Sequence, residues 1–390
     1  MLNRQRRTKE KWARGMRRIA LAGACAVIAL AAGVMPTAIA PPAEATGEGT
    51  RVKRGGRIVT YLSDASNLPL PGDGAAKPDQ INYAFALIED GEATGAHWRG
   101  VKQLERYLRA HPEVDGVLSV GGWGADGFSD ACATEAGRQK LAASILRLVD
   151  DHGFVGVDID WEYPGSSAAG VKSRPEDEEN WYALLGVLRE GLDARQAEQG
   201  RDFLLSVAVG AGAQQLAAAD GARLNRLVDQ VVVMAYDLKG FERVTGHHAG
   251  LYPAEPTPGT GAYAVEALTR SGLAEAKVLL GMPAYARVWR QVSGGGDGLD
   301  QRAATSGSRT MSYDAAQALE KEGYTRYYDE KAKAAWLFNG DIFVSVEDER
   351  SVAEKVAWTL KNKLLGVAVW SMNQDADGTM HALLDQALSQ

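Results

Sequence analysis

Three acidic residues, Asp158, Asp160 and Glu162, stand two positions apart in the segment 153–165. The residues between them are β-branched or aromatic and have no helical spacing, which predicts an extended strand. On a strand, residues two positions apart point to the same side, about 6.5–7 Å apart at each step. Carboxylates that crowd one face in this way are stable only if at least one of them keeps a proton. The row is therefore predicted to transfer protons rather than to support the structure.

Eight apolar segments with the composition of strands alternate with amphipathic helical stretches. The candidate strands are 58–62, 81–88, 117–120, 155–161, 204–209, 231–236, 278–282 and 367–370. Near-continuous apolar strands separated by helices predict a parallel sheet covered by helices. Eight of them favour a (β/α)8 TIM barrel. The alternative, a doubly wound sheet, lacks the Gly-x-Gly-x-x-Gly turn that a dinucleotide site would place after the first strand.

One interval between the candidate strands is too long for a single helix. Residues 290–345 contain a glycine-rich loop, a helical piece at 313–322, and three strand-like pieces. They predict a small α+β insertion after the seventh strand of a catalytic barrel that spans 46–390. Such an insertion would rise above the barrel face where enzymes of this architecture keep their active sites.

The first 45 residues have the pattern of a signal peptide. Eight basic residues precede an uncharged run at 19–35, and small residues at 38–40 and 43–45 offer cleavage sites. Cleavage after Ala45 and secretion are predicted. The alternative is a retained membrane anchor through residues 19–35, although that run is at the short end of the roughly 17–25 residues that a spanning helix needs.

Charge and cysteine content argue against nucleic-acid binding and against an internal disulfide. Residues 1–45 carry eight positive and two negative charges, so their removal takes the formal net charge from −7 to −13. A chain that acidic has no electrostatic footprint for nucleic acid. Cys132 is the single cysteine after residue 45, which excludes an internal disulfide in the exported chain. A buried structural thiol is the simplest interpretation.

The carboxyl ends of barrel strands carry the chemistry of this architecture. Glu162 ends the fourth candidate strand, Tyr236 and Asp237 end the sixth, Trp370 ends the eighth, and Trp123 follows the third. An acid surrounded by aromatic platforms and hydrogen-bonding groups suits a sugar, whose ring faces stack on aromatic side chains. The residues alone therefore predict a glycosidase.

An ordinary retaining glycosidase needs a second carboxylate about 5–5.5 Å from the first, on another wall of the site. The seventh strand end offers Tyr285 and Arg287 but no acid, and Asp160 projects from the same strand as Glu162. Either Asp237 serves as the second carboxylate, or the substrate supplies its own nucleophile.

The chain resembles glycoside hydrolase family 18, the chitinase family, over almost all of residues 57–375. The strongest element is the D-x-D-x-E run at 158–162 with the Tyr-Pro-Gly that follows. Supporting motifs lie at 81–86, 119–123, 234–237, 245–249, 285–287 and Trp370. The resemblance implies a chitinase that cleaves β-1,4 bonds between N-acetylglucosamine units and uses no cofactor. Secretion is expected from the signal-peptide pattern, and a monomer is expected. The alternatives are an endo-β-N-acetylglucosaminidase acting on glycans or peptidoglycan, and a non-catalytic chitin-binding lectin.

Enzymes of this family use the substrate's own 2-acetamido oxygen as the nucleophile. The resemblance implies that Glu162 is the general acid and then the base, that Asp160 orients the acetamido group, and that Asp158 shares a proton with Asp160. Tyr236 would hydrogen-bond the acetamido group. The expected substrate-binding residues are Tyr61, Phe85, Ser119, Gly122, Trp123, Met234, Asp237, Tyr285, Arg287 and Trp370, with Trp370 as the floor and Trp123 on the leaving-group side. No metal is expected, because acids in a row on one strand make a poor octahedral site.

One position departs from the family pattern D-x-x-D-x-D-x-E, whose first Asp falls on Val155. Val155 has the opposite parity to the three acids, so on a regular strand it points toward the helix layer. The change is predicted to leave the chemistry intact.

Overall fold

The computed structural model describes residues 54–253 and 259–390. The predicted signal peptide at 1–45, and the alternative anchor at 19–35, lie outside these residues. Within the described part of the chain, no helix is both long and apolar enough to span a membrane.

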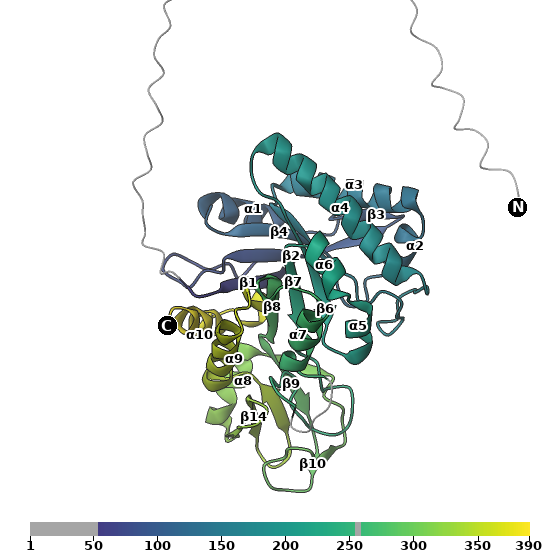
Figure 1. Ribbon diagram of the computed structural model, residues 1–390. Helices are drawn as coiled ribbons and strands as arrows, with labels where there is room; N and C mark the ends of the chain where they lie inside the picture. The colour runs from purple at the N-terminus through teal and green to yellow at the C-terminus, as the bar shows by residue number, and fades with distance from the viewer. Residues whose placement is uncertain (1–53, 254–258) are drawn as a thin grey trace, which may run out of the picture. The chain divides into compact units, whose positions relative to one another are not determined.

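Eight parallel strands form a closed barrel (Figure 1), which confirms the predicted fold. The ring consists, in chain order, of β1 (Arg57–Ser63), β2 (Gln80–Glu89), β4 (Asp115–Gly121), β5 (Gly156–Asp160), β6 (Leu204–Gly210), β7 (Gln230–Met234), β8 (Val278–Pro283) and β16 (Gly366–Trp370). β1 pairs with both β16 and β2, which closes the ring. A short strand, β3 (Glu92–Thr94), extends β2 as an antiparallel partner.

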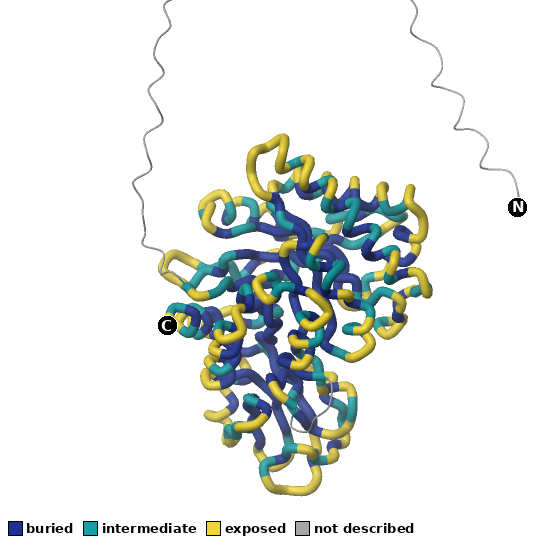
Figure 2. Tube along the Cα trace, in the orientation of Figure 1, coloured by how far each residue is buried: buried dark blue, intermediate teal, exposed yellow. Residues whose placement is uncertain are grey.

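Helices cover the outside of the barrel, with exposed residues on their outward sides, whereas the strands inside are buried (Figure 2). They are α1 (Val101–Ala110), α2 (Phe128–Cys132), α3 (Glu135–His152), α4 (Asp177–Gln199), α5 (Ala213–Ala218), α6 (Gly221–Leu227), α7 (Gly261–Arg270), α9 (Glu349–Lys361) and α10 (Thr379–Leu388). The strands are buried on both faces, which explains their near-continuous apolar sequences. Three acids occupy the first turn of α4, where the helix dipole favours negative charge.

The insertion follows β8 and forms its own five-stranded antiparallel sheet, in the order β12-β9-β15-β14-β13. Its elements are β9 (Tyr285–Trp289), the β10–β11 hairpin (Val292–Ser293 and Arg302–Ala303), β12 (Arg309–Ser312), α8 (Tyr313–Gln317), β13 (Thr325–Asp329), β14 (Ala334–Phe338) and β15 (Phe343–Val346). Its sheet thus begins at residue 285, earlier than the predicted boundary of 290. The run from β8 into the start of β9 is buried and has no charged residue before Arg287, so the change of sheet leaves no polar break in the sequence.

The barrel interior below the acid row is polar. Gln80 donates to Asn82 at 2.7 Å, and Gln230 donates to Gln80 at 3.0 Å, all three being buried. These two hydrogen bonds offset part of the cost of burying the three amides. This layer supports the lower end of the acid row from beneath.

Val155 lies just before β5, half-buried, with its backbone held between Gly116 and Leu204. Restoring the family residue with Val155→Asp is expected to lower the free energy of unfolding by about 1 kcal/mol, because a carboxylate loses water there. The turnover number should stay close to that of the wild type. Urea unfolding and steady-state kinetics on one preparation measure both quantities. A large gain in turnover would contradict the assignment of Val155 to the scaffold.

Candidate active site

Strand β5 directs Asp158 and Asp160 into the barrel, where both are buried, and Glu162 follows two residues after its end. Trp161, of opposite parity, packs outside the barrel against Phe128 of α2, with ring centroids 5.0 Å apart. The alternation predicted from the sequence is therefore present. Asp160 and Glu162 line a cavity of about 740 Å³, whereas Asp158 lies outside its lining.

A glycine in β4 allows this packing. Gly121 has a φ of 114°, and a Cβ there would lie 2.2 Å from the carbonyl oxygen of Asp160. The next residue, Gly122, donates its backbone N–H to that carbonyl at 2.8 Å. Only glycine permits both the backbone conformation and the close approach.

Tyr61 and Ser119, which were predicted to bind the substrate, lie outside the cavity lining. The hydroxyl groups of Tyr61 and Ser119 donate to Oδ2 of Asp158, at 3.1 and 2.7 Å. Both residues are buried, and neither lines the cavity. They contact Asp158 rather than the space for a substrate. The register of β4 against β5 places Ser119 directly beside Asp158, and Tyr61 reaches the same carboxylate from β1.

Burial dominates the electrostatics of the acid row. It raises the pKa of Asp158, and it raises the pKa of Asp160 further with the help of the Glu162 and Asp158 charges. Burial also raises the pKa of Glu162 to about 7, a shift that a hydrogen bond with Tyr163 opposes and the charge of Asp237 reinforces. A carboxyl group with a pKa near 7 is partly protonated at neutral pH, which suits a general acid.

Asp237 is fully engaged by its neighbours. Its Oδ1 accepts from the Tyr285 hydroxyl at 2.6 Å and from Nε of Arg287 at 2.7 Å, and its Oδ2 lies 2.5 Å from the Arg287 guanidinium. Although burial works in the opposite direction, His248 and Arg287 hold the pKa of Asp237 well below its usual range. A carboxylate bound on both oxygens is poorly placed to attack a sugar.

Aromatic rings form the floor and one rim of the cavity. Trp370, at the end of β16, stacks beside Phe85 with centroids 5.6 Å apart and an interplanar angle of 21°. Trp98 fixes this pair by donating its indole N–H to the Phe85 carbonyl at 2.8 Å. Trp123 is 58% exposed, and its ring lies 6.3 Å from that of Tyr163.

The structure brings most of the predicted site residues together. The cavity is lined by Phe85, Trp123, Asp160, Glu162, Met234, Tyr236, Asp237, Tyr285, Arg287 and Trp370. Gly122 instead lines a second cavity of about 550 Å³, which shares Phe85 and Trp123 with the first.

Several lining residues were absent from the sequence prediction. They are Tyr163, Ala168, Gly210, Ala211, Gly212, Gln215, Leu238, Phe241, Gly259, Ser308, Thr310 and Gln374. Tyr163 and Phe241 carried a usable signal, since each closely follows a predicted strand end. Gln215 lies on a helix and Ser308 lies in the insertion, so only the tertiary structure reveals them.

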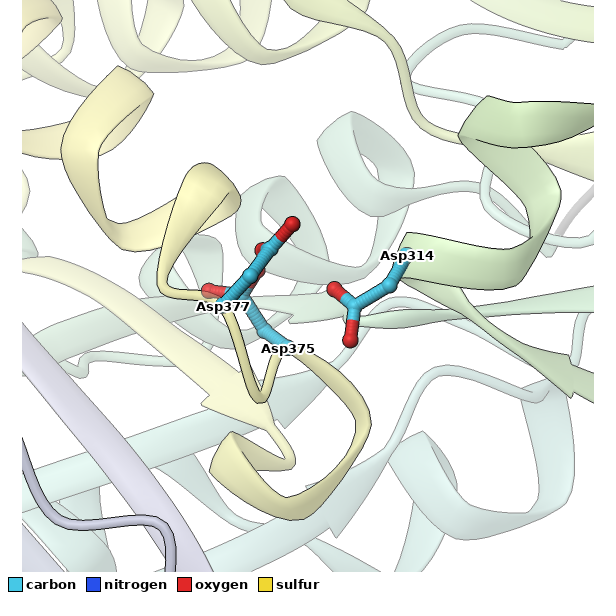
Figure 3. Close-up of side chains that lie close together, drawn as sticks. All are labelled: Asp314, Asp375 and Asp377. Carbon is cyan, nitrogen blue, oxygen red and sulfur yellow. The ribbon is translucent and has the colours of Figure 1, made fainter.

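His247 and a cluster of three aspartates contact other parts of the protein. His247 contacts Asp329 of β13 at 3.1 Å. The carboxylates of Asp314, Asp375 and Asp377 lie near one another (Figure 3), with ligand oxygens within 4.8 Å. Asp375 accepts from the backbone N–H groups of residues 380 and 381 at the start of α10, and Asp314 accepts from that of residue 376. This cluster joins α8 of the insertion to the segment after β16.

A closed barrel with an acid row beneath an aromatic-lined cavity defines a glycosidase of the TIM-barrel class. The model of glycosyl hydrolases family 18 matches residues 57–375, and the chain belongs to that family. Chitinase A1 of Niallia circulans is 34% identical over 303 residues, which are 72% of this chain and 43% of that protein. Chitinase 1 of Aphanocladium album is 31% identical over 289 residues, 72% of this chain and 66% of that protein. The chain thus spans less than two thirds of the length of these relatives.

A solved family 18 N-acetylglucosaminidase from Paenibacillus barengoltzii is similar over its whole length. It has a TM-score of 0.80 and 34% identity, and the match covers 85% of this chain and 100% of that one. Chitinase ChiW from Paenibacillus sp. str. FPU-7 has a TM-score of 0.79 at 31% identity, over 85% of this chain and 43% of that one.

Asp237→Asn is expected to move the alkaline limb of the kcat/KM profile to lower pH. With Glu162 as the expected general acid, that limb should follow loss of the Glu162 proton and lie near its pKa of about 7. The negative charge of Asp237 raises this pKa, and its removal also leaves the Arg287 cation uncompensated, so both effects lower the pKa. Profiles of the variant and of Asp202→Asn, an exposed control, measure the shift. An unmoved or raised limb would exclude this coupling.

Proposed function

We propose that the chain hydrolyses β-1,4 bonds between N-acetylglucosamine units, in chitin or chito-oligosaccharides, by substrate-assisted retaining catalysis. The proposal depends on the contacts of Tyr285 and Arg287 that engage both carboxylate oxygens of Asp237. Among the described residues that line the cavity, the other carboxylates are Asp160 and Glu162, both from the β5 segment. With no free carboxylate on another wall, the acetamido oxygen of the substrate is the available nucleophile.

Glu162 supplies the proton. Its carboxyl group protonates the glycosidic oxygen as the bond from that oxygen to the anomeric carbon breaks, and the acetamido oxygen closes on the same carbon. A water molecule then opens the resulting oxazolinium and returns its proton to Glu162. Two displacements at one carbon retain its configuration.

The neighbouring polar groups control the acetamido group. Asp160 is buried beside Glu162 and accepts from the acetamido N–H, and its charge stabilises the oxazolinium cation. Asp158 shares a proton with Asp160, which allows the acids to coexist. Burial and the nearby Tyr285 and Asp160 raise the pKa of Tyr236, so its phenol keeps a proton to donate to the acetamido group.

The proposal also includes secretion and a monomeric state, both of which were expected from the sequence. The chain is secreted after removal of residues 1–45 and acts as a monomer on chitin or its oligosaccharides. The relatives named as chitinases support the substrate class.

An N-acetylglucosaminidase is the second candidate, favoured by the similarity to the Paenibacillus barengoltzii enzyme over its whole chain. Chromogenic N-acetylglucosaminide, chitobioside and chitotrioside separate the candidates, with a glycoprotein and peptidoglycan assayed in parallel. Turnover of the chitobioside or chitotrioside is the expected result. Turnover of the N-acetylglucosaminide alone would identify an N-acetylglucosaminidase, and turnover of the glycoprotein or peptidoglycan alone would identify an endo-β-N-acetylglucosaminidase. Oligosaccharide binding without turnover would identify a lectin and overturn the proposal.

A further inference from the structure

Gln215 brings a side-chain amide to the wall of the main cavity. It belongs to α5, the short helix that follows β6, and it is half-buried. Within residues 54–253 and 259–390, no group donates to this amide or accepts a hydrogen bond from it. A primary amide has two N–H donors and a carbonyl acceptor, so all of its hydrogen-bonding capacity is available to a substrate.

Two glycines fix the position of this amide. Gly210 ends β6, and Gly212 stands just before α5. A Cβ at Gly212 would lie 2.3 Å from Oε1 of Gln215, and a Cβ at Gly210 would lie 2.8 Å from its Cγ. The side chain of Gln215 therefore lies back across both glycines. Because packing already restricts it, it has less conformational freedom to lose when a ligand binds.

Gln215 is next to the side chain that follows the general acid. A Cβ at Gly210 would also lie 3.0 Å from Cε1 of Tyr163, so the side chains of Tyr163 and Gln215 both lie over this glycine. Tyr163 in turn forms a hydrogen bond with Glu162. In the proposed function, on which this inference rests, Glu162 protonates the oxygen of the leaving unit.

The order of the strands separates Gln215 from the residues expected to hold the reacting sugar. Consecutive strands of the ring are β16, β8, β7, β6, β5 and β4. Trp370, the expected floor, ends β16, the insertion follows β8, and Tyr236 follows β7. The insertion residues on the cavity wall are Tyr285, Arg287, Ser308 and Thr310. Gln215 follows β6, Tyr163 follows β5 and Trp123 follows β4, so these three side chains form a separate part of the wall, where the first leaving unit would lie.

The chemistry of the Gln215 amide matches the 2-acetamido group of that leaving unit. Each of the two groups has a carbonyl acceptor and an N–H donor, so they can pair through two hydrogen bonds. Ala211 and Gly212 line the cavity close to Gln215 in the sequence and have no side chain beyond Cβ, which leaves room for the acetyl methyl group.

We propose that Gln215 selects an N-acetylated sugar as the first leaving unit, by pairing its side-chain amide with the 2-acetamido group of that unit. This deepens the proposed function by adding a substrate preference on the leaving side of the cavity. An aromatic ring stacks on a sugar face whatever the substituent at C2 is, whereas the amide responds to that substituent. A leaving sugar without a group at C2 leaves the amide unpaired.

The test compares three substrates with the full-length protein and measures kcat/KM for release of the group at the reducing end. They are chitotriose, the same trisaccharide with 2-deoxyglucose as its reducing-end unit, and a chromogenic chitobioside, which has no sugar in the leaving position. Gln215→Met keeps the length of the side chain and removes its polar groups. It should lower kcat/KM for chitotriose by about two- to tenfold, the typical effect of a neutral hydrogen bond, and leave the other two values close to those of the wild type.

The matched control is Gln214→Met, at the preceding residue of α5, which is exposed and outside the cavity lining. It should change none of the three values. An equal loss on both trisaccharides, a loss shared by all three substrates, or no loss on chitotriose would overturn the role of Gln215. If the wild type hydrolyses none of the three substrates, the proposed function fails as well, and that result is distinct from a change in preference.

Discussion

Replacing Glu162 by glutamine is expected to lower kcat by about 10²–10⁴-fold, the contribution typical of a general acid–base residue. Glutamine keeps the size and hydrogen-bonding reach of the side chain but carries no transferable proton. The loss should therefore appear in kcat, whereas the affinity for chitotriose should remain close to that of the wild type. Chromogenic chitobioside kinetics and calorimetric titration of chitotriose measure the two quantities.

The control for Glu162→Gln is Glu198→Gln on the exposed face of α4, which should change neither quantity. Turnover of Glu162→Gln within about tenfold of the wild type would remove Glu162 from the role of acid. Loss of affinity together with turnover would point to a damaged cavity, which the titration would reveal.

The same substitution has a stability readout with a defined sign. The folded-state pKa of Glu162, about 7, lies above the value of about 4.3 expected in the unfolded chain. Wild-type stability therefore falls as the pH rises between these two values, since ionising the buried carboxyl costs free energy. Glu162→Gln should be more stable than the wild type at about pH 8 and should lose this advantage below about pH 4. Thermal unfolding at both pH values measures the difference.

The sequence predicted the acid row correctly because strand periodicity is local. Residues 158, 160 and 162 must share a side whatever the rest of the chain does, and Trp161 must point the other way. The barrel was predictable for a related reason, since eight apolar strands alternating with helices have few other arrangements. Both inferences needed only neighbours along the chain.

Tyr61 and Ser119 show where this reasoning stops. The resemblance to family 18 made them candidates for binding the substrate, yet their hydroxyl groups donate to Asp158. The register between β4 and β5 pairs Ser119 with Asp158, and Tyr61 reaches the same carboxylate from β1, contacts that no local pattern encodes. Gln215 and Ser308 escaped prediction for the same reason, because contacts between distant segments bring them to the cavity.

Asp160→Asn is expected to lower kcat by about 10²–10³-fold, as loss of one preorganised electrostatic group typically does. Asparagine can still accept a hydrogen bond from the acetamido N–H, but it lacks the negative charge that stabilises the oxazolinium. The variant should therefore lose more affinity for a thiazoline analogue of the cyclised sugar than for chitobiose. Inhibition constants for the two ligands measure this difference.

Asp158→Asn is the matched control, because it removes the neighbouring charge on the same strand. Asp158 lies outside the cavity lining and is held by Tyr61 and Ser119, so it acts on the sugar only through Asp160. Asp158→Asn should lower kcat by a smaller factor than Asp160→Asn does. It should weaken binding of the thiazoline analogue no more than binding of chitobiose. If both variants lost the same factor of affinity for the thiazoline analogue, the stabilising charge would belong to the acid row as a whole. Selective loss in Asp160→Asn alone places the stabilising charge at the acetamido group, where a substrate-derived nucleophile requires it.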